Sequence, residues 1–511
     1  MNDCLKLLLA LPVILGLALL LATLGHAAYA RRIPPSPKPG RGAGRQVLIL
    51  DNGMANQNLS GGEGHPSWRR ALAWAQALIV ILVAPALWFP TLRPQLTVLA
   101  LLFLALLWLA LALAEGRLWP PSPYDVPLAL LLVMAALSAF RSPVPELTLP
   151  KVTALILGLA LYRALLDLAW DLPPHDPSGG LPSLWPALGA AFALALLFSL
   201  VGLIGGLRPS KVPWVGEYLA RLPKLITSLP GTQFGLVSTN QLGGALLYVL
   251  PLALALLLAP WRLDSGPRSS LRGARWLAGL VALLLAATLL ATQSRGAWAG
   301  MLAGLLLLLA LLWPWGRWAV LLILFAAFLA WALVGPRLLL WLIQAFDRAH
   351  GLNTSVGMVS LAGRLEIWSR ALACIWRSPW LGCGLGTFRA LDPNVAAHAS
   401  IFDVGIPHAH NIFLQVAYDL GLPGLSAYLA LLFLAVHMGW VAYRRSQGLP
   451  RALAVGSLAA LLAYHVYGLT DVVALGSKPG VLWWALLALI AALQRLVVWP
   501  ASANLREFPN Y

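Results

Sequence analysis

Three short polar segments interrupt an otherwise apolar chain, and each carries a side chain that is able to do chemistry. Arg295 lies in a short turn between two very apolar stretches, Arg364 lies in the segment Gly-Arg-Leu-Glu-Ile-Trp, and His408 and His410 come just before another apolar stretch. A neutral imidazole accepts a proton near pH 7, and a guanidinium binds phosphate or carboxylate oxygens in pairs. These residues are therefore the candidates for acid–base chemistry and anion binding.

Each of these residues also has a purely structural explanation. Arg295 could be a snorkelling anchor at the end of a membrane helix, and Arg364 could pair with Glu366 or another acidic neighbour. A histidine at the start of a helix is more often a cap or an interfacial residue than a catalyst. Taken one at a time, the three segments do not decide between structure and chemistry.

The composition of the chain excludes a soluble enzyme. Of 511 residues, 60% are hydrophobic and 10% are charged, whereas soluble domains average about 25% charged residues. The mean hydropathy of +0.80 also excludes a disordered chain. The net charge of +17 fits anionic lipid and phosphate-bearing substrates rather than nucleic acid. Three cysteines, without a Cys-x-x-Cys or His/Cys cluster, predict neither a disulfide framework nor a structural metal.

Thirteen apolar stretches are long enough to suggest membrane helices, and none alternates as a strand would. The sequence therefore predicts an all-α polytopic membrane protein with about twelve core helices and one extra N-terminal helix. The first stretch resembles a signal peptide in its small-residue end, but its charges are in the reverse of the usual order, which favours a retained helix. The stretches lie near 5–29, 71–89, 95–114, 124–140, 147–169, 181–205, 236–260, 277–293, 297–313, 317–334, 411–441, 452–470 and 480–498.

Basic residues predict the orientation of these helices. Residues 31–70 carry seven Lys or Arg, 261–276 carry four and 442–451 carry three, and strict alternation places all three segments on one side. The positive-inside rule makes that side the cytoplasm. The predicted organisation is an extra helix (1–30), a cytoplasmic linker (31–70), a membrane core (71–500) and a cytoplasmic tail (501–511). The core contains two external loops, 206–235 and 335–410, and a helix is predicted over 361–376 in the second loop.

The spacing of the polar segments resembles that of a known family. His410 and Asn411 are followed by nine residues and then by Gly421-Leu-Pro-Gly424, which matches the His-[Asn/Ser/Gln]-x9-Gly-x-x-Gly pattern of bacterial O-antigen ligases. The order, spacing and sidedness of these motifs over about 236–475 make chance agreement unlikely. Four further segments resemble motifs of the same family. They are the Ser294-Arg295-Gly296 turn, Gly363-Arg364 with Trp368, the group Pro379, Gly382, Gly384, Thr387 and Phe388, and the helix start at Asn240-Gln241.

The resemblance implies a multi-pass glycosyltransferase of the GT-C type in the inner membrane, with an active site that faces the periplasm or cell exterior. The donor would be a glycan on undecaprenyl diphosphate, and the acceptor a sugar hydroxyl of lipid A–core or of another glycan. The reaction would be inverting and would use no nucleotide, cofactor or metal. The external loops contain no paired acidic motif for a metal, so arginine is expected to neutralise the diphosphate.

The resemblance also assigns roles to residues. His410 would be the general base that accepts the proton of the acceptor hydroxyl, while Arg295 and Arg364 would hold the donor diphosphate. His408 is the competitor for the role of His410. The expected supporting residues are Asn411, which could orient His410 or bind sugar, Asn240 and Arg389; Gly421 and Gly424 would be structural, and Trp368, Trp376 and Trp380 could stack on sugar rings.

Two alternatives stay open at this point. O-antigen polymerases and O-linked oligosaccharyltransferases share much of the motif pattern, so the acceptor could be another lipid-linked repeat unit. A lipid-linked glycan transporter would also be polytopic and basic, but charges are expected inside its helices along the substrate path. Here most apolar stretches are nearly free of charge and the polar groups gather at one face, which favours an enzyme.

The predicted orientation can be tested with single cysteines introduced at Ser265 and Ser400. Strict alternation and the charge asymmetry place Ser265 in the cytoplasm and Ser400 outside. A membrane-impermeant maleimide added to intact cells should therefore label Ser400→Cys and leave Ser265→Cys unlabelled. Labelling of Ser265→Cys with protection of Ser400→Cys would reverse the orientation.

Overall fold

The computed structural model describes residues 2–32, 67–116, 119–170, 184–204, 238–259, 268–329, 332, 361–390 and 406–498. The predicted loop 206–235, the predicted tail 501–511 and most of the predicted linker 31–70 lie outside these residues. The predicted external loop 335–410 is described over 361–390 and 406–410.

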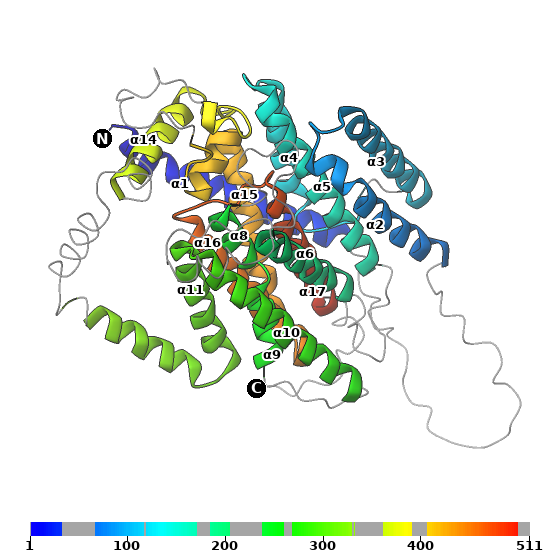
Figure 1. Cartoon of the computed structure of the whole chain (residues 1–511), viewed down its shortest axis with the longest axis vertical. Helices are drawn as coiled ribbons and strands as arrows, with labels where there is room; N and C mark the ends of the chain where they lie inside the picture. Colours follow the sequence, from blue (N-terminus) through cyan, green and yellow to red (C-terminus); the bar gives the residue numbers. More distant parts are fainter. Residues whose placement is uncertain are drawn as a thin grey trace, which may run out of the picture.

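The regular elements of the described residues are all helical (Figure 1). The predicted helix over 361–376 is confirmed by α14. The labelled α-helices are α1 (Asn2–Arg32), α2 (Ser67–Trp88), α3 (Pro94–Glu115), α4 (Asp125–Phe140), α5 (Pro145–Trp170), α6 (Trp185–Ile204), α8 (Thr239–Leu246), α9 (Leu250–Leu258), α10 (Arg268–Thr292), α11 (Arg295–Leu312), α14 (Leu361–Arg377), α15 (Ile412–Arg445), α16 (Gly448–Gly468) and α17 (Val481–Val498), and an unlabelled helix spans Gly316–Leu329. Two short 3₁₀ helices are η2 (Phe388–Ala390) and η4 (Lys478–Gly480).

Among the described residues, eleven helical segments are long and apolar enough to cross a membrane. Two shorter apolar helices, Asp125–Phe140 and Gly316–Leu329, account for the remaining predicted stretches. Each of the thirteen apolar stretches thus contains a helix, and the predicted all-α polytopic membrane fold is confirmed.

Two boundaries differ from the prediction. The stretch 236–260 contains two helices, because α8 ends at Leu246 and α9 begins at Leu250. Pro251 explains the break, since it lacks an N–H and its ring clashes with the carbonyl four residues earlier in a continuous helix. The helix α2 begins at Ser67, so the last residues of the predicted linker belong to the first core helix.

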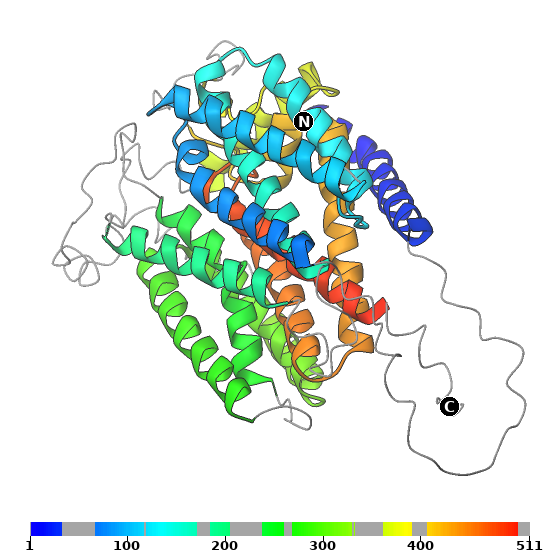
Figure 2. The ribbon, with the colours of Figure 1, turned by 90° about the vertical axis from the view of Figure 1, so that its right-hand side faces the viewer.

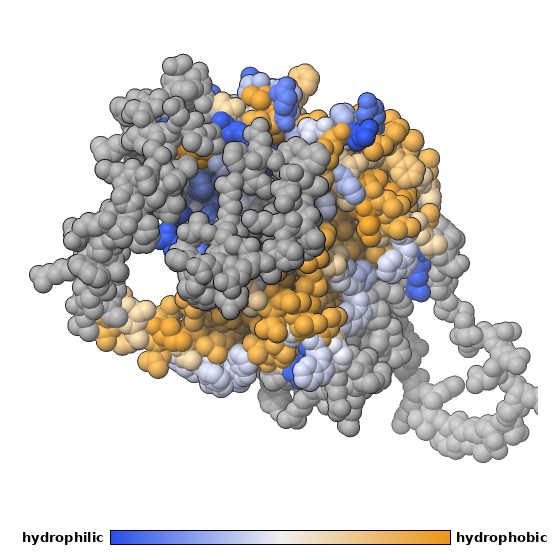
Figure 3. All heavy atoms as spheres, in the orientation of Figure 1, coloured by the Kyte–Doolittle hydropathy of each residue, from blue (hydrophilic) through white to orange (hydrophobic). Residues whose placement is uncertain are grey.

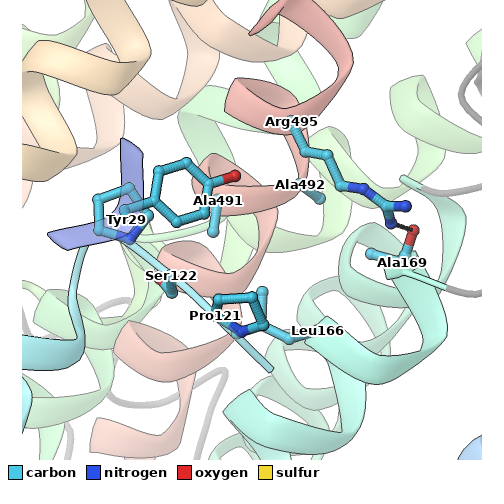
Figure 4. A pocket seen from close by; sticks show the side chains of 9 residues that line it. Tyr29, Pro121, Ser122, Leu166, Ala169, Ala491, Ala492 and Arg495 are labelled. Carbon is cyan, nitrogen blue, oxygen red and sulfur yellow. Dashed lines mark hydrogen bonds between the residues drawn. The ribbon is translucent and has the colours of Figure 1, made fainter. Parts of the chain in front are cut away.

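The N-terminal helix α1 packs along α15 and α4 (Figure 2). The ring of His26 in α1 lies edge-on to that of His437 in α15, with centroids 5.7 Å apart. Near its C-terminal end, Tyr29 lines a small pocket together with residues of α5 and α17 (Figure 4). In this pocket Arg495 donates a hydrogen bond to the Ala169 carbonyl at 2.6 Å. The first helix is therefore packed into the bundle.

The bundle has a buried centre and an apolar outer layer. Most residues of α5 and α17 are buried by neighbouring helices, whereas α3 leaves large side chains such as Leu102, Phe103 and Leu106 exposed. On the face in Figure 3, apolar side chains cover the outer helices on the right, and hydrophilic side chains gather mainly along the upper edge. Exposed leucine and phenylalanine on an outer helix fit contact with lipid acyl chains.

A kink in α15 receives the segment that follows α14. Gly421 interrupts α15 with a φ of 71°, a conformation that glycine adopts without steric penalty. The freed N–H of Leu422 donates to the Pro379 carbonyl at 2.7 Å, and a methyl group on Gly421 would lie 2.6 Å from the Trp380 carbonyl oxygen. The disulfide between Cys374 and Cys383 ties the last turn of α14 to the same segment. The kink and the disulfide together fix α14 relative to α15.

Replacing the kink glycine should destabilise the protein. In Gly421→Ala, the backbone conformation with a φ of 71° and a ψ of 179°, which is essentially restricted to glycine, costs roughly 1–3 kcal/mol, and the new methyl group collides with the Trp380 carbonyl. Gly16→Ala is a matched control, because no atom lies within 4 Å of the added methyl group. Thermal unfolding in detergent should show a lower melting temperature for Gly421→Ala only. Equal melting temperatures would mean that the kink tolerates a side chain.

Candidate functional site

The ends of four helices meet at one end of the bundle. The Tyr467 hydroxyl near the end of α16 donates to the Asn240 carbonyl at the start of α8, at 2.8 Å. A methyl group on Gly296, at the start of α11, would lie 2.8 Å from Thr470 Oγ1, just beyond α16. Asn411, just before α15, donates from Nδ2 to the Leu469 carbonyl at 3.3 Å. Segments predicted separately to carry chemistry are thus brought together around the loop after α16.

Two histidines and one aspartate form the polar centre of this end. His410 Nδ1 lies 3.2 Å from Asp471 Oδ1, and His408 Nε2 lies 3.7 Å from the same oxygen. The centroids of the two imidazole rings are 4.3 Å apart. The backbone N–H of Val472 also donates to Asp471 Oδ1, at 2.8 Å. A buried carboxylate is therefore held by its own loop and faces both histidines.

The backbone before α15 directs His410 towards Asp471. His410 has a φ of 49°, which is uncommon for a residue with a side chain. The following residue, Asn411, is the N-cap, and its side-chain oxygen accepts hydrogen bonds from the N–H groups of Phe413 and Leu414. The side chain of Gln415 accepts a hydrogen bond from the Ala409 N–H at 2.7 Å. Asn411 thus caps the helix, and its expected role in orienting His410 or binding sugar stays a prediction.

The two histidines differ in how far they are buried. His408 is buried, and this lowers its pKa to about 3, so its ring is neutral at neutral pH. His410 is partly exposed. Burial alone would raise the pKa of Asp471, but the hydrogen bond with His410, the charges of His408 and His410 and the hydrogen bond from the Val472 N–H together outweigh it and hold that pKa below its ordinary value. The site therefore contains a carboxylate, a buried neutral imidazole and an imidazole that reaches the surface.

The two predicted arginines border this centre on different helices. Arg295 is exposed at the first position of α11, one residue before the Gly296 contact with Thr470. Arg364, on α14, lies close enough to the Tyr467 hydroxyl to interact with it electrostatically. The suggested pair of Arg364 with Glu366 is not the one seen, because Glu366 pairs with Arg370 one turn later. Both arginines are therefore near the end of α16.

The remaining predicted residues have mixed positions. Arg389 is exposed in η2 and lies within electrostatic reach of His408. Gly424 is inside α15, where a methyl group would collide with the Leu420 side chain. Trp380 is exposed, whereas Trp368 packs against the core.

The cluster of His408, His410 and Asp471 also has the composition of a metal site. Each residue offers one ligand atom, and these atoms lie within 4.8 Å of one another. Two imidazoles and one carboxylate suit several divalent transition metals. The expectation of a metal-independent site thus stays a prediction, which is tested below by chelation.

Sequence reasoning missed Asp471 and Tyr467. Asp471 follows an apolar stretch and is one of only 18 acidic residues in the chain, so its rarity was an available signal. Tyr467 had no such signal, because its role depends on contacts with Asn240 and Gly296 from distant parts of the chain.

Residues 280–429 match the protein family described as O-antigen ligase. The matched region contains Arg295, Arg364 and His410, and it ends before Asp471. None of the curated proteins matches the chain.

Proposed function

We propose, from the premise that the chain contains an O-antigen ligase domain, that it transfers a glycan from undecaprenyl diphosphate to an acceptor sugar hydroxyl. The transfer takes place at the outer face of the inner membrane. The observation that carries this proposal is the contact of His410 with Asp471, 3.2 Å long, beside two arginines from different helices.

In this mechanism Asp471 fixes the orientation of the base. Its carboxylate accepts the Nδ1–H of His410, which leaves the lone pair of Nε2 available for the acceptor. Nε2 takes the proton of the acceptor hydroxyl as the hydroxyl oxygen attacks the anomeric carbon. The bond between that carbon and the diphosphate oxygen breaks, and the electron pair leaves with the lipid diphosphate. Attack opposite the leaving group inverts the anomeric centre.

Arg295 and Arg364 stabilise the leaving group. Negative charge develops on the diphosphate oxygen as the glycosidic bond breaks, and guanidinium groups bind such oxygens bidentately while remaining charged. Their positions on α11 and α14, both near Tyr467, suit two ligands of one diphosphate. In this proposal the arginines take the part that a divalent metal plays in many other phosphate sites.

His410→Ala should lose catalysis while the protein still inserts and binds the lipid-linked donor. Removal of a general base costs about 10²–10⁴-fold in rate. His408→Ala should be much milder, since His408 is buried and further from Asp471 than His410 is. The measurement is in vitro transfer from purified donor by the two variants and the wild type.

The same assay contains its own controls. Transfer by the wild type should be unchanged in EDTA, and loss of activity that Zn²⁺ or Mn²⁺ restores would mean that the histidine–aspartate cluster holds a metal. A His410→Ala protein within a few-fold of wild type would remove the base from the mechanism. An inactive His408→Ala protein beside an active His410→Ala protein would exchange their roles.

Arg295→Lys and Arg364→Lys should each lose most of the transfer activity although the charge is kept. Lysine is a point charge and cannot replace the two-pronged contact, and loss of one charge-assisted hydrogen bond costs roughly ten- to a hundredfold in rate. Arg377→Lys, at the exposed end of α14, is the matched control and should keep its activity. If both site variants ran at wild-type rates, the arginines would be interfacial anchors.

A further inference from the structure

A second group of basic side chains adjoins His408. Two of the chain's six lysines, Lys151 and Lys478, come together there with Arg389. They come from three elements that are distant in the sequence, namely α5, η4 and η2. The mechanism above uses none of the three.

Close packing brings the segments before Arg389 and Lys478 against Lys151. A methyl group on Gly386 would lie 2.6 Å from Lys151 Cγ and 3.3 Å from its Cε, so the lysine side chain passes the segment that leads into Arg389. A methyl group on Gly476, two residues before Lys478, would lie 2.4 Å from the Lys151 carbonyl oxygen. Lys478 Nζ lies 3.8 Å from the centroid of the Phe89 ring. The packing thus brings the segments that carry Arg389 and Lys478 against Lys151.

Lys151 has one acidic and two basic electrostatic partners among the described residues. Lys151 interacts electrostatically with Asp419, whose Oδ1 accepts a hydrogen bond from the Gly386 N–H at 3.0 Å. Lys151 also interacts electrostatically with Arg389, and Lys478 interacts electrostatically with Lys151. Among the described residues, Asp419 acts on Lys151 as an opposite charge, whereas Lys151 and Arg389, and Lys151 and Lys478, interact as like charges, which destabilise each other. A bound anion would relieve that repulsion.

The position of this group separates it from the two arginines. Arg295 and Arg364 lie near the end of α16, at Thr470 and Tyr467, whereas Lys151 and Arg389 act on His408. Two basic groups built from different elements therefore adjoin one histidine–aspartate centre. A transferase that joins two substrates needs a place for each.

We propose that Lys151, Lys478 and Arg389 form an acceptor subsite that binds a phosphate group of the acceptor. This inference rests on the proposed transferase function. The donor diphosphate binds Arg295 and Arg364, and the acceptor phosphate binds the second group, so that the acceptor hydroxyl reaches His410 between them.

The test uses the full chain in phosphatidylcholine nanodiscs with saturating lipid-linked donor. The acceptor probes are lipid A–core with its phosphates and the same molecule after dephosphorylation. For the wild type, dephosphorylation should raise the acceptor KM by about ten- to a hundredfold, with little change in kcat. Lys478→Gln and Arg389→Gln should raise the KM of the phosphorylated acceptor similarly and leave that of the dephosphorylated acceptor unchanged. Arg377→Gln, on the exposed end of α14, is the matched control.

Three outcomes would overturn the subsite. The first is a wild-type acceptor KM that does not change on dephosphorylation. The second is an increase in the donor KM, instead of the acceptor KM, in the two variants. The third is a difference between the variants and the wild type that appears only when phosphatidylglycerol is added to the discs. The last outcome would assign the basic group to a bilayer headgroup.

Direct binding of the two acceptor probes separates this inference from the proposed function. If the wild type transferred no glycan, the transferase function would fail, but phosphate-dependent binding that both variants lose would still support the subsite. Binding that does not depend on the phosphate would overturn the subsite, whatever the outcome for transfer.

Discussion

The close packing of α11 against α16 determines the geometry of the whole polar end. Gly296, Gly300 and Gly304 recur at four-residue intervals on α11, and a methyl group on Gly300 would lie 2.3 Å from the Ala463 carbonyl oxygen. Small residues at this spacing let membrane helices approach at backbone distance. Because the two helices are antiparallel, the start of α11 then lies beside the end of α16. Arg295 and the loop that carries Asp471 are consequently neighbours.

The same end of the bundle contains the irregular backbone, and each segment of it is held by specific hydrogen bonds. Unpaired backbone groups are costly in an apolar environment. The Tyr464 hydroxyl donates to the Val473 carbonyl at 2.8 Å, and the Asn411 side chain caps α15. At the kink of α15, the N–H of Leu422 bonds to the segment after α14. Satisfying the backbone and positioning the polar side chains are therefore achieved by the same contacts.

The helices were predictable from the sequence, whereas the composition of the site was predictable only in part. Apolar stretches long enough to span a membrane leave little choice of element, and Arg295, Arg364 and His410 stood out as polar residues with family-like spacing. The partner of His410 did not, since Asp471 lies two helices later in the chain. The break at Pro251 shows the same limit, because an apolar stretch gives the length of a span and not its continuity. Which distant segments of the chain lie close together depends on how the helices pack, and the pattern of apolar stretches does not show it.

A comparison between two groups of charges supports the functional interpretation of the polar end. In α5, Arg163 and Asp167 are one turn apart and 3.6 Å from each other, and the guanidinium lies over the rings of Trp108 and Trp119. This pair is local, since both charges lie on one helix and are buried beside each other. At the polar end, the charges come from α5, α11, α14, η2, η4 and the loop after α16. Bringing like charges together from separate elements destabilises the protein alone, and the anionic substrates proposed above would provide the compensating charge.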